Sequence, residues 1–216
     1  MRPVRSIIIY NGGSAGDFLK LICNQQLGTE FDYELNNTGL IFAQRHYFKS
    51  FIDHCFYQDP DAIAQLDVSK VLPVENSHFY FEALESVTDS FFYIDYPDNL
   101  QHNIIKIYCN KQWKNNRELI YQYHLQRLPI NLRRFITVDN IEQALEKLWL
   151  KQLKIWRTTA RLKLIQLADL MRHESLVPVV EQIIQQPLLD PDKLRITHQQ
   201  WLDKNSELIG LCAKLA

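Results

Sequence analysis

The chain has 216 residues and a formal net charge of −1, and 46% of its residues are hydrophobic while 23% are charged. This length allows a sizeable core, and the composition is that of a globular protein, which excludes fibrous and disordered classes. The four cysteines form no CxxC pair and the seven histidines are scattered, so we expect free thiols and no protein-bound metal.

The first element expected is a buried strand at Ser6–Tyr10, a short β-branched run that ends in Asn-Gly-Gly. This run is too short for a signal peptide or a membrane span, so we expect a cytoplasmic protein without a membrane span. Helical spacing follows at once in the apolar residues Phe18, Leu19, Ile22, Cys23 and Leu27. Strand, glycine-rich turn and helix form the opening of a βαβ unit.

Further strands are expected at Gly39–Ala43, Val71–Val74, Phe91–Ile94, Asn103–Cys109 and Leu162–Leu167. Helices are expected at Gln44–Tyr57, Lys111–Gln126, Asp139 to about Arg161, Ser175–Gln186 and Ile196–Ala216. This alternation predicts a three-layer α/β fold with a short, mostly parallel, P-loop-like sheet and a helical C-terminal third. We expect residues 1–216 to form one α/β domain in which 139–216 are mainly helical.

The long helix that begins at Asp139 has two features that the sequence makes clear. Asp139 and Glu142 are spaced as a capping box at its start. One face is apolar and the opposite face carries a basic stripe of Lys147, Lys151, Lys154, Arg157 and Arg161. No RNA- or DNA-binding motif accompanies this stripe and the chain is slightly acidic, so a nucleic-acid partner is not expected.

The strongest functional signal is the turn Gly12-Gly13-Ser14-Ala15-Gly16-Asp17, because it holds three of the six glycines in the chain. Glycines let successive backbone N–H groups converge, and the next helix adds its positive end, so a phosphate or sulfate fits. The GKS or GKT ending of a Walker A loop is absent. Asp17 suits a helix start but repels a phosphate, so three alternatives stay open: Asp17 points away, binds the substrate, or marks a turn that has lost its ligand.

This strand, turn and helix resembles the 5′-phosphosulfate loop of the sulfotransferase superfamily, roughly strand, Lys-Ser-Gly-Thr-Thr, x-Leu. Aligned on Ser14 and Leu19, Gly13 stands where the family has lysine, Ala15 where it has glycine, and Gly16 and Asp17 where it has threonines. Leu162–Met171 with Val177–Ile184 is similar to the family's late strand and helix. Val71–His78 is similar to the strand that delivers a catalytic base. At the family's 3′-phosphate site, the chain offers Asn110, Lys111 and Arg117 in place of arginine and serine.

The resemblance implies sulfuryl transfer from 3′-phosphoadenosine 5′-phosphosulfate to a hydroxyl or amine of a small-molecule or glycan acceptor. Gly12–Gly16 would cradle the donor and His78 would be the base. Since the loop lysine is absent, we expect Lys106, Lys111 or Arg117 to face the turn and Asp17 to face away. Two alternatives remain: a non-catalytic ligand- or partner-binding descendant of the fold, and a serine hydrolase using Ser14, because Gly12-x-Ser14-x-Gly16 fits a nucleophile elbow.

Overall fold

A computed structural model describes residues 4–29, 33–35, 41–43, 47–125 and 133–213. It confirms the expected fold class, with a four-stranded parallel sheet covered by helices and a helical C-terminal region. The sheet has the order β4 (Val74–Ser77), β1 (Ser6–Ile9), β5 (Phe91–Asp95) and β6 (Leu162–Gln166). A separate antiparallel pair joins β2 (Tyr33–Leu35) and β3 (Ile41–Ala43).

The order of the strands places a topological switch point at β1. From β1 the chain passes first to β4 on one side and later to β5 on the other, and Ile7 lies opposite both Glu75 and Phe91. In open parallel sheets, ligands bind outside the carboxyl ends of the strands at such a point. The turn that follows β1 is therefore at the position where this fold class places its sites.

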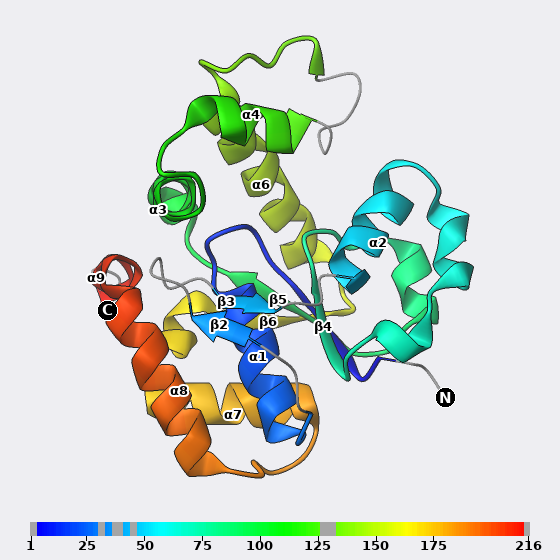
Figure 1. The fold of residues 1–216 in the computed structure, drawn as a ribbon, viewed down its shortest axis with the longest axis vertical. Helices are drawn as coiled ribbons and strands as arrows, with labels where there is room; N and C mark the ends of the chain where they lie inside the picture. Colours follow the sequence, from blue (N-terminus) through cyan, green and yellow to red (C-terminus); the bar gives the residue numbers. More distant parts are fainter. Residues whose placement is uncertain (1–3, 30–32, 36–40, 44–46, 126–132, 214–216) are drawn as a thin grey trace.

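The helices of the described chain are α1 (Gly16–Gln26), α2 (Tyr47–Tyr57), α3 (Gln101–Trp113), α4 (Arg117–Leu125), α6 (Ile141–Thr158), α7 (His173–Ile184), α8 (Pro191–Lys204) and α9 (Ser206–Ala213). Short 3₁₀ turns are η1 (Pro60–Gln65), η2 (Val68–Lys70), η3 (Glu82–Ser86), η4 (Asp98–Leu100) and η5 (Leu167–Met171). In Figure 1, α1, α7 and α8 lie below the sheet, and α3, α4 and α6 lie above it, beyond the end of β1. No helix among the described residues is long and apolar enough to cross a membrane.

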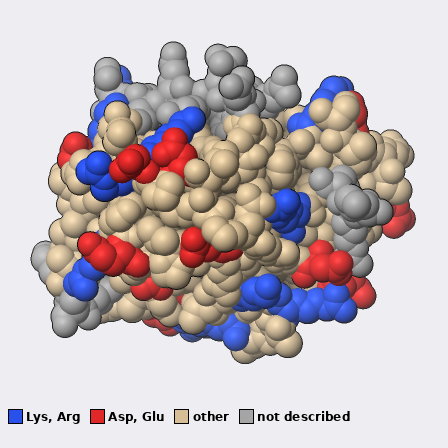
Figure 2. Space-filling view, turned by 90° about the horizontal axis from the view of Figure 1, so that it is seen from below, with Lys and Arg blue, Asp and Glu red and all other residues tan. Residues whose placement is uncertain are grey.

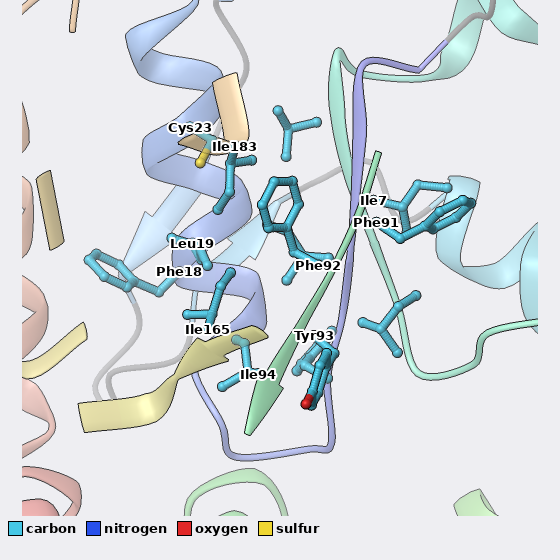
Figure 3. Close-up of a cluster of buried hydrophobic side chains, with 14 of the residues drawn as sticks. Ile7, Phe18, Leu19, Cys23, Phe91, Phe92, Tyr93, Ile94, Ile165 and Ile183 are labelled. Carbon is cyan, nitrogen blue, oxygen red and sulfur yellow. The ribbon is translucent and has the colours of Figure 1, made fainter. Parts of the chain in front are cut away.

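The main core lies on both faces of the sheet. Figure 3 shows Phe92 between the sheet and α1, while Ile7 and Phe91 point toward the opposite face. All three side chains are fully buried. A strand covered on both faces needs apolar residues at successive positions, which is why β1 and β5 read as continuous apolar runs.

A second apolar cluster belongs to α3, α4 and α6, which we call the helical cap. Its buried members are Ile105, Cys109, Ile120, Ile136, Ile141, Leu145 and Trp149. In the chain, the cap lies between β5 and β6, so it is an insertion into the sheet's last crossover. It provides the surface that faces the turn after β1.

The expected strand at Asn103–Cys109 is wrong, since these residues lie within α3. Gln101, Ile104, Ile105 and Cys109 are all buried, with the three- and four-residue spacing of a helix face. The β-branched residues suggested a strand, but packing between the cap and the turn outweighs that propensity.

The strand expected at Val71–Val74 is displaced, because β4 begins at Val74 and continues through Ser77. Polar residues occupy this strand because side chains of α1 pair with them, as described below. Several boundaries also differ, most of them in the helices. The helix expected at Lys111–Gln126 is split between α3 and α4. The long helix begins at Ile141, and the side chain of the preceding Asn140 makes no hydrogen bond to the first turn of the helix. The terminal helix is split into α8 and α9 at Asn205.

Candidate functional site

The turn that follows β1 is tight and internally bonded. Gly13 has φ 82° and Ala15, at the cap position of α1, has φ 67°, so both lie in the left-handed region. The Ser14 amide donates to the Asn11 carbonyl oxygen at 3.2 Å and the Ser14 hydroxyl donates to the same oxygen at 2.5 Å. These bonds fix the direction in which the chain enters α1.

Two glycines of the turn are required by aromatic rings that approach the backbone. A Cβ on Gly12 would lie 2.7 Å from Trp149 of α6 and 2.9 Å from Tyr108 of α3. A Cβ on Gly16 would overlap the ring of Tyr10. These glycines therefore serve close packing, a purpose that the sequence alone did not reveal.

Several amide N–H groups of the turn have no hydrogen-bond partner in the described chain. They belong to Gly12, Gly13, Ala15, Gly16, Asp17 and Phe18. The groups at the start of α1 also carry the positive end of the helix dipole. The expectation that the turn presents unpaired donors is therefore met by the geometry.

A pocket of about 40 Å³ opens beside these groups and is lined on one side by Gly13, Ala15, Gly16 and Asp17. Lys111 of α3 and Trp201 of α8 line the other side. This volume has room for a small anion or a few water molecules, whereas pockets for drug-sized ligands measure roughly 300 Å³ or more.

Lys111 is the cation that reaches this pocket. Its Nζ atom donates to Asn205 Oδ1 at 2.8 Å and to the Lys204 carbonyl oxygen at 3.1 Å. No carboxylate lies within ion-pair distance of it in the part of the chain that the structure describes. Burial lowers the pKa of Lys111, and the charge of Glu207 opposes this shift. A half-buried ammonium with only neutral partners favours an anion nearby.

The other two candidate cations lie elsewhere. Lys106 and Arg117 line a separate groove of about 420 Å³. Arg117 also pairs with Glu142, its Nε atom lying 3.3 Å from Oε1. Of the three cations expected near the turn, the structure brings only Lys111 to it, so Arg117 is not in position to bind a ligand held there.

On its opposite flank the turn meets a polar group that we call the Asp17 cluster. It consists of Asp17, Tyr10, Lys49, Asn76 and His78. Asp17 accepts from Tyr10 Oη at 2.8 Å and from Asn76 Nδ2 at 2.9 Å. Lys49 Nζ lies 3.9 Å from Asp17 Oδ2 and donates to Tyr10 Oη at 2.7 Å. Burial alone would raise the pKa of Asp17, but the Lys49 charge and the bonds from Asn76 and Tyr10 lower it to about 2.

His78 directly follows β4, as the sequence predicts, and its ring packs against Tyr10, but it is not among the residues that line the pocket. Its Nδ1 atom is 2.9 Å from the Tyr10 carbonyl oxygen. Since a carbonyl only accepts, Nδ1 carries the proton and the neutral ring presents its lone pair at Nε2. Burial, together with the charge of Lys49, lowers the pKa of His78 to about 3. At neutral pH this imidazole is therefore uncharged and weakly basic.

Ser14 is fully buried, and its hydroxyl is committed to the Asn11 carbonyl oxygen. The geometry therefore gives the serine hydrolase hypothesis no accessible nucleophile. The same side of the turn holds a buried network that sequence reasoning missed. Asn11 Nδ2 donates to Tyr96 Oη at 3.0 Å, and Tyr96 donates to Gln101 Oε1 at 2.8 Å. Asn11 Oδ1 and Gln101 Nε2 remain without partners among the described residues.

A buried ion pair between α1 and β4 lies next to the Asp17 cluster. Lys20 Nζ of α1 lies 2.5 Å from Glu75 Oε2 of β4, and both residues are at most 3% exposed. The second oxygen of Glu75 accepts from the Leu72 amide at 2.8 Å. Asn24 adds two bonds to the backbone of Val74, at 2.8 and 3.1 Å. Paired in this way, polar residues can occupy a buried strand.

Arg157 joins the cap to the end of β5. Its guanidinium donates to Asp95 at 2.7 and 3.0 Å, to the Tyr96 carbonyl oxygen at 2.7 Å and to Asp98 at 2.6 Å. The sequence placed Arg157 in the basic stripe of the long helix, but it did not reveal these bonds to the end of β5. The sequence did contain a signal for such bonds. Asp95 and Tyr96 are polar residues at the end of an apolar strand, as are Tyr10 and Asn11 at the end of the first strand.

Charges of both signs are mixed on the face seen from below, over α7 and α8 (Figure 2). Within the described residues, no three His, Cys, Asp or Glu side chains are grouped so as to hold a metal ion. No protein-family model, curated protein or solved structure matches the chain.

Proposed function

We propose that the turn after β1 holds a sulfate or phosphate group and that the chain catalyses a sulfotransferase-like transfer from 3′-phosphoadenosine 5′-phosphosulfate. One observation carries the proposal. Six neighbouring amide N–H groups at the switch point of the sheet have no partner among the described residues. A tetrahedral anion satisfies several such donors at once and gains from the helix dipole.

In this proposal the residues around the turn have separate roles. The unpaired amides of Gly13, Ala15, Gly16 and Asp17 hold the transferring group, and Lys111 supplies positive charge to it. The acceptor oxygen or nitrogen bonds to sulfur while the bond from sulfur to the phosphate oxygen breaks. The proton of the acceptor passes to His78 Nε2, and the phosphate leaves with the electron pair. A small-molecule or glycan acceptor and a cytoplasmic location belong to the proposal, the latter supported by four free cysteines.

The size of the pocket limits how the donor binds. At about 40 Å³ it admits the anionic group alone. The nucleoside therefore lies across the mouth of the pocket, or α3 and α8 separate on binding. Such a rearrangement is common where a ligand completes a site.

A non-catalytic binding protein is the second candidate, and one observation favours it. The pKa of His78 is lowered to about 3, by burial first and by Lys49 second, whereas an efficient general base titrates near neutral pH. Binding of the donor without measurable transfer would support this candidate. Transfer that His78→Ala abolishes, with donor affinity unchanged, would support the enzyme.

The deciding experiment is a calorimetric titration with 3′-phosphoadenosine 5′-phosphate at low salt. We expect binding that Lys111→Ala weakens about tenfold, the loss of one charge-assisted contact. Lys106→Ala is the matched control, because Lys106 is on the same helix but lines the other groove. Absence of binding at millimolar ligand, or an equal loss in the control, would contradict the proposal.

A further inference from the structure

Asp17 raises a difficulty for any anion held at the turn, because this acidic residue lines the same pocket as Gly13 and Gly16, while its carboxylate bonds to Tyr10 and Asn76. Although burial favours the neutral form, Lys49, Asn76 and Tyr10 lower the pKa of Asp17 to about 2, so it is charged at physiological pH. Two like charges a few ångströms apart repel strongly where water is partly excluded. Something must offset this charge if an anion is to bind.

The residue in position to do so is Lys49 of α2. Its side chain is 15% exposed, and its Nζ atom lies 3.9 Å from Asp17 Oδ2. It also donates to Tyr10 Oη, which in turn donates to Asp17 Oδ2, so its charge reaches the carboxylate by a direct and a relayed route. The ammonium lies 5.1 Å above the centre of the Tyr10 ring, which adds a cation–π contact.

Lys49 is absent from the residues that line the pocket, so its effect on a bound anion passes through Asp17. We infer that Lys49 is a positioning residue that makes the pocket tolerant of an anion by neutralising Asp17 from outside it. This inference rests on the proposed function, since it concerns the same pocket. Lys49 of α2 would then supply, through Asp17, positive charge that a lysine at the position of Gly13 would supply by direct contact.

The test is a double-mutant cycle on the full chain with inorganic sulfate as the probe, titrated at low salt. We expect Lys49→Met to weaken sulfate binding at least tenfold, because Asp17 is then uncompensated. Asp17→Asn should bind sulfate as tightly as the wild type or more tightly. Lys49→Met combined with Asp17→Asn should recover affinity to within about twofold of the wild type. Lys70→Met is the matched control, since Lys70 pairs with Asp67 on the surface.

The outcomes separate this inference from the proposed function. If the wild type does not bind sulfate, the proposed function fails. If the wild type binds and Lys49→Met binds equally well, or if the double variant is as weak as Lys49→Met, only the role of Lys49 fails. Should Lys49→Met not fold, Asp17→Asn decides the matter, because weaker sulfate binding in that variant overturns the inference.

A spectroscopic readout distinguishes the electrostatic role from a purely structural one. The carbon-13 shift of the Asp17 carboxyl group reports its titration. We expect Lys49→Met to raise the pKa of Asp17 and Lys49→Arg to leave it low, with sulfate affinity close to the wild type. A residue that merely fixes α2 to the sheet would leave this pKa unchanged, which would contradict the inference.

Discussion

The two flanks of the turn after β1 differ in how their polar groups are paired. On the flank facing α2 and β4, Asp17 has bonds from Tyr10 and Asn76 and the charge of Lys49 close by. On the flank facing α3 and α8, the partners of Lys111 among the described residues are neutral oxygen atoms. Since folded proteins pair most of their buried polar groups, the unpaired flank is where a ligand is expected and the paired flank is its support.

The largest expected effect comes from breaking the buried Lys20–Glu75 ion pair next to the Asp17 cluster. Lys20→Met leaves Glu75 buried without its partner. Because burial already raises the pKa of Glu75, this carboxyl group must then stay charged in the core or take up a proton, and we expect a loss of about 3–5 kcal/mol in the free energy of unfolding. Adding Glu75→Gln keeps an acceptor for the Leu72 amide and should recover at least half of the loss. Urea unfolding measures all three proteins, with Lys147→Met on the exposed face of α6 as the control. A loss below about 1 kcal/mol would show that the pair is dispensable.

A smaller effect is expected from crowding the ring of Tyr10, which lines the pocket and also belongs to the Asp17 cluster. Gly16→Ala places a methyl group against Tyr10, and Tyr10 also bonds to Asp17 and Lys49. We expect a loss of about 1–3 kcal/mol from this overpacking. Gly210→Ala in α9 meets nothing within 4 Å and should instead stabilise the protein by up to about 1 kcal/mol. Equal effects of the two substitutions in urea unfolding would refute the close approach of Tyr10.

The third expected effect is a dependence of stability on pH, which is small for each unit of pH. Burial and the charge of Lys49 lower the pKa of His78 to about 3, so between about pH 6.5 and pH 3 the unfolded chain binds more protons than the folded one. Stability then falls as the pH falls, by at most about 1.4 kcal/mol per unit from this group.

His78→Asn removes this titration and retains a donor for the Tyr10 carbonyl oxygen, so its stability should fall less steeply in the same range. His54→Asn, at an exposed position of α2, is the control and should follow the wild type. Asp17 acts at lower pH, since its pKa of about 2 lies below the unfolded value and its contribution is lost between about pH 4 and pH 2. Identical urea-unfolding profiles for His78→Asn and the wild type would mean that His78 is not buried beside a charge.

The elements that could be predicted from the sequence are those whose structure is determined by their own residues and not by contacts with distant parts of the chain. The strands at Ser6–Ile9 and Phe91–Asp95 were predicted because burial on both faces requires continuous apolar runs. The helix at Gln101–Trp113 was not, because its β-branched residues favour a strand and only contact with the turn and the cap makes it helical. Strand β4 was predicted a few residues too early, because its polar residues can be buried only when side chains of α1 pair with them.

The candidate site divides in the same way. The turn at Gly12–Gly16 and the position of His78 at a strand end were predicted, because glycine chemistry and strand ends are local features. Lys49 and Asn76 were missed, since they reach Asp17 only because β4 pairs with β1 and α2 packs on β4. Spacing along the chain does not encode these contacts.

Arg157 has a consequence for how this fold can vary. It bonds the exit of β5, at Asp95, Tyr96 and Asp98, to the last turns of the helix that leads back to β6. The two ends of the cap insertion are thus held together by Arg157 at the carboxyl end of β5. Insertions with adjoining ends tolerate changes of length well. We therefore expect changes of length within the cap to leave the pairing of β5 with β6 in place.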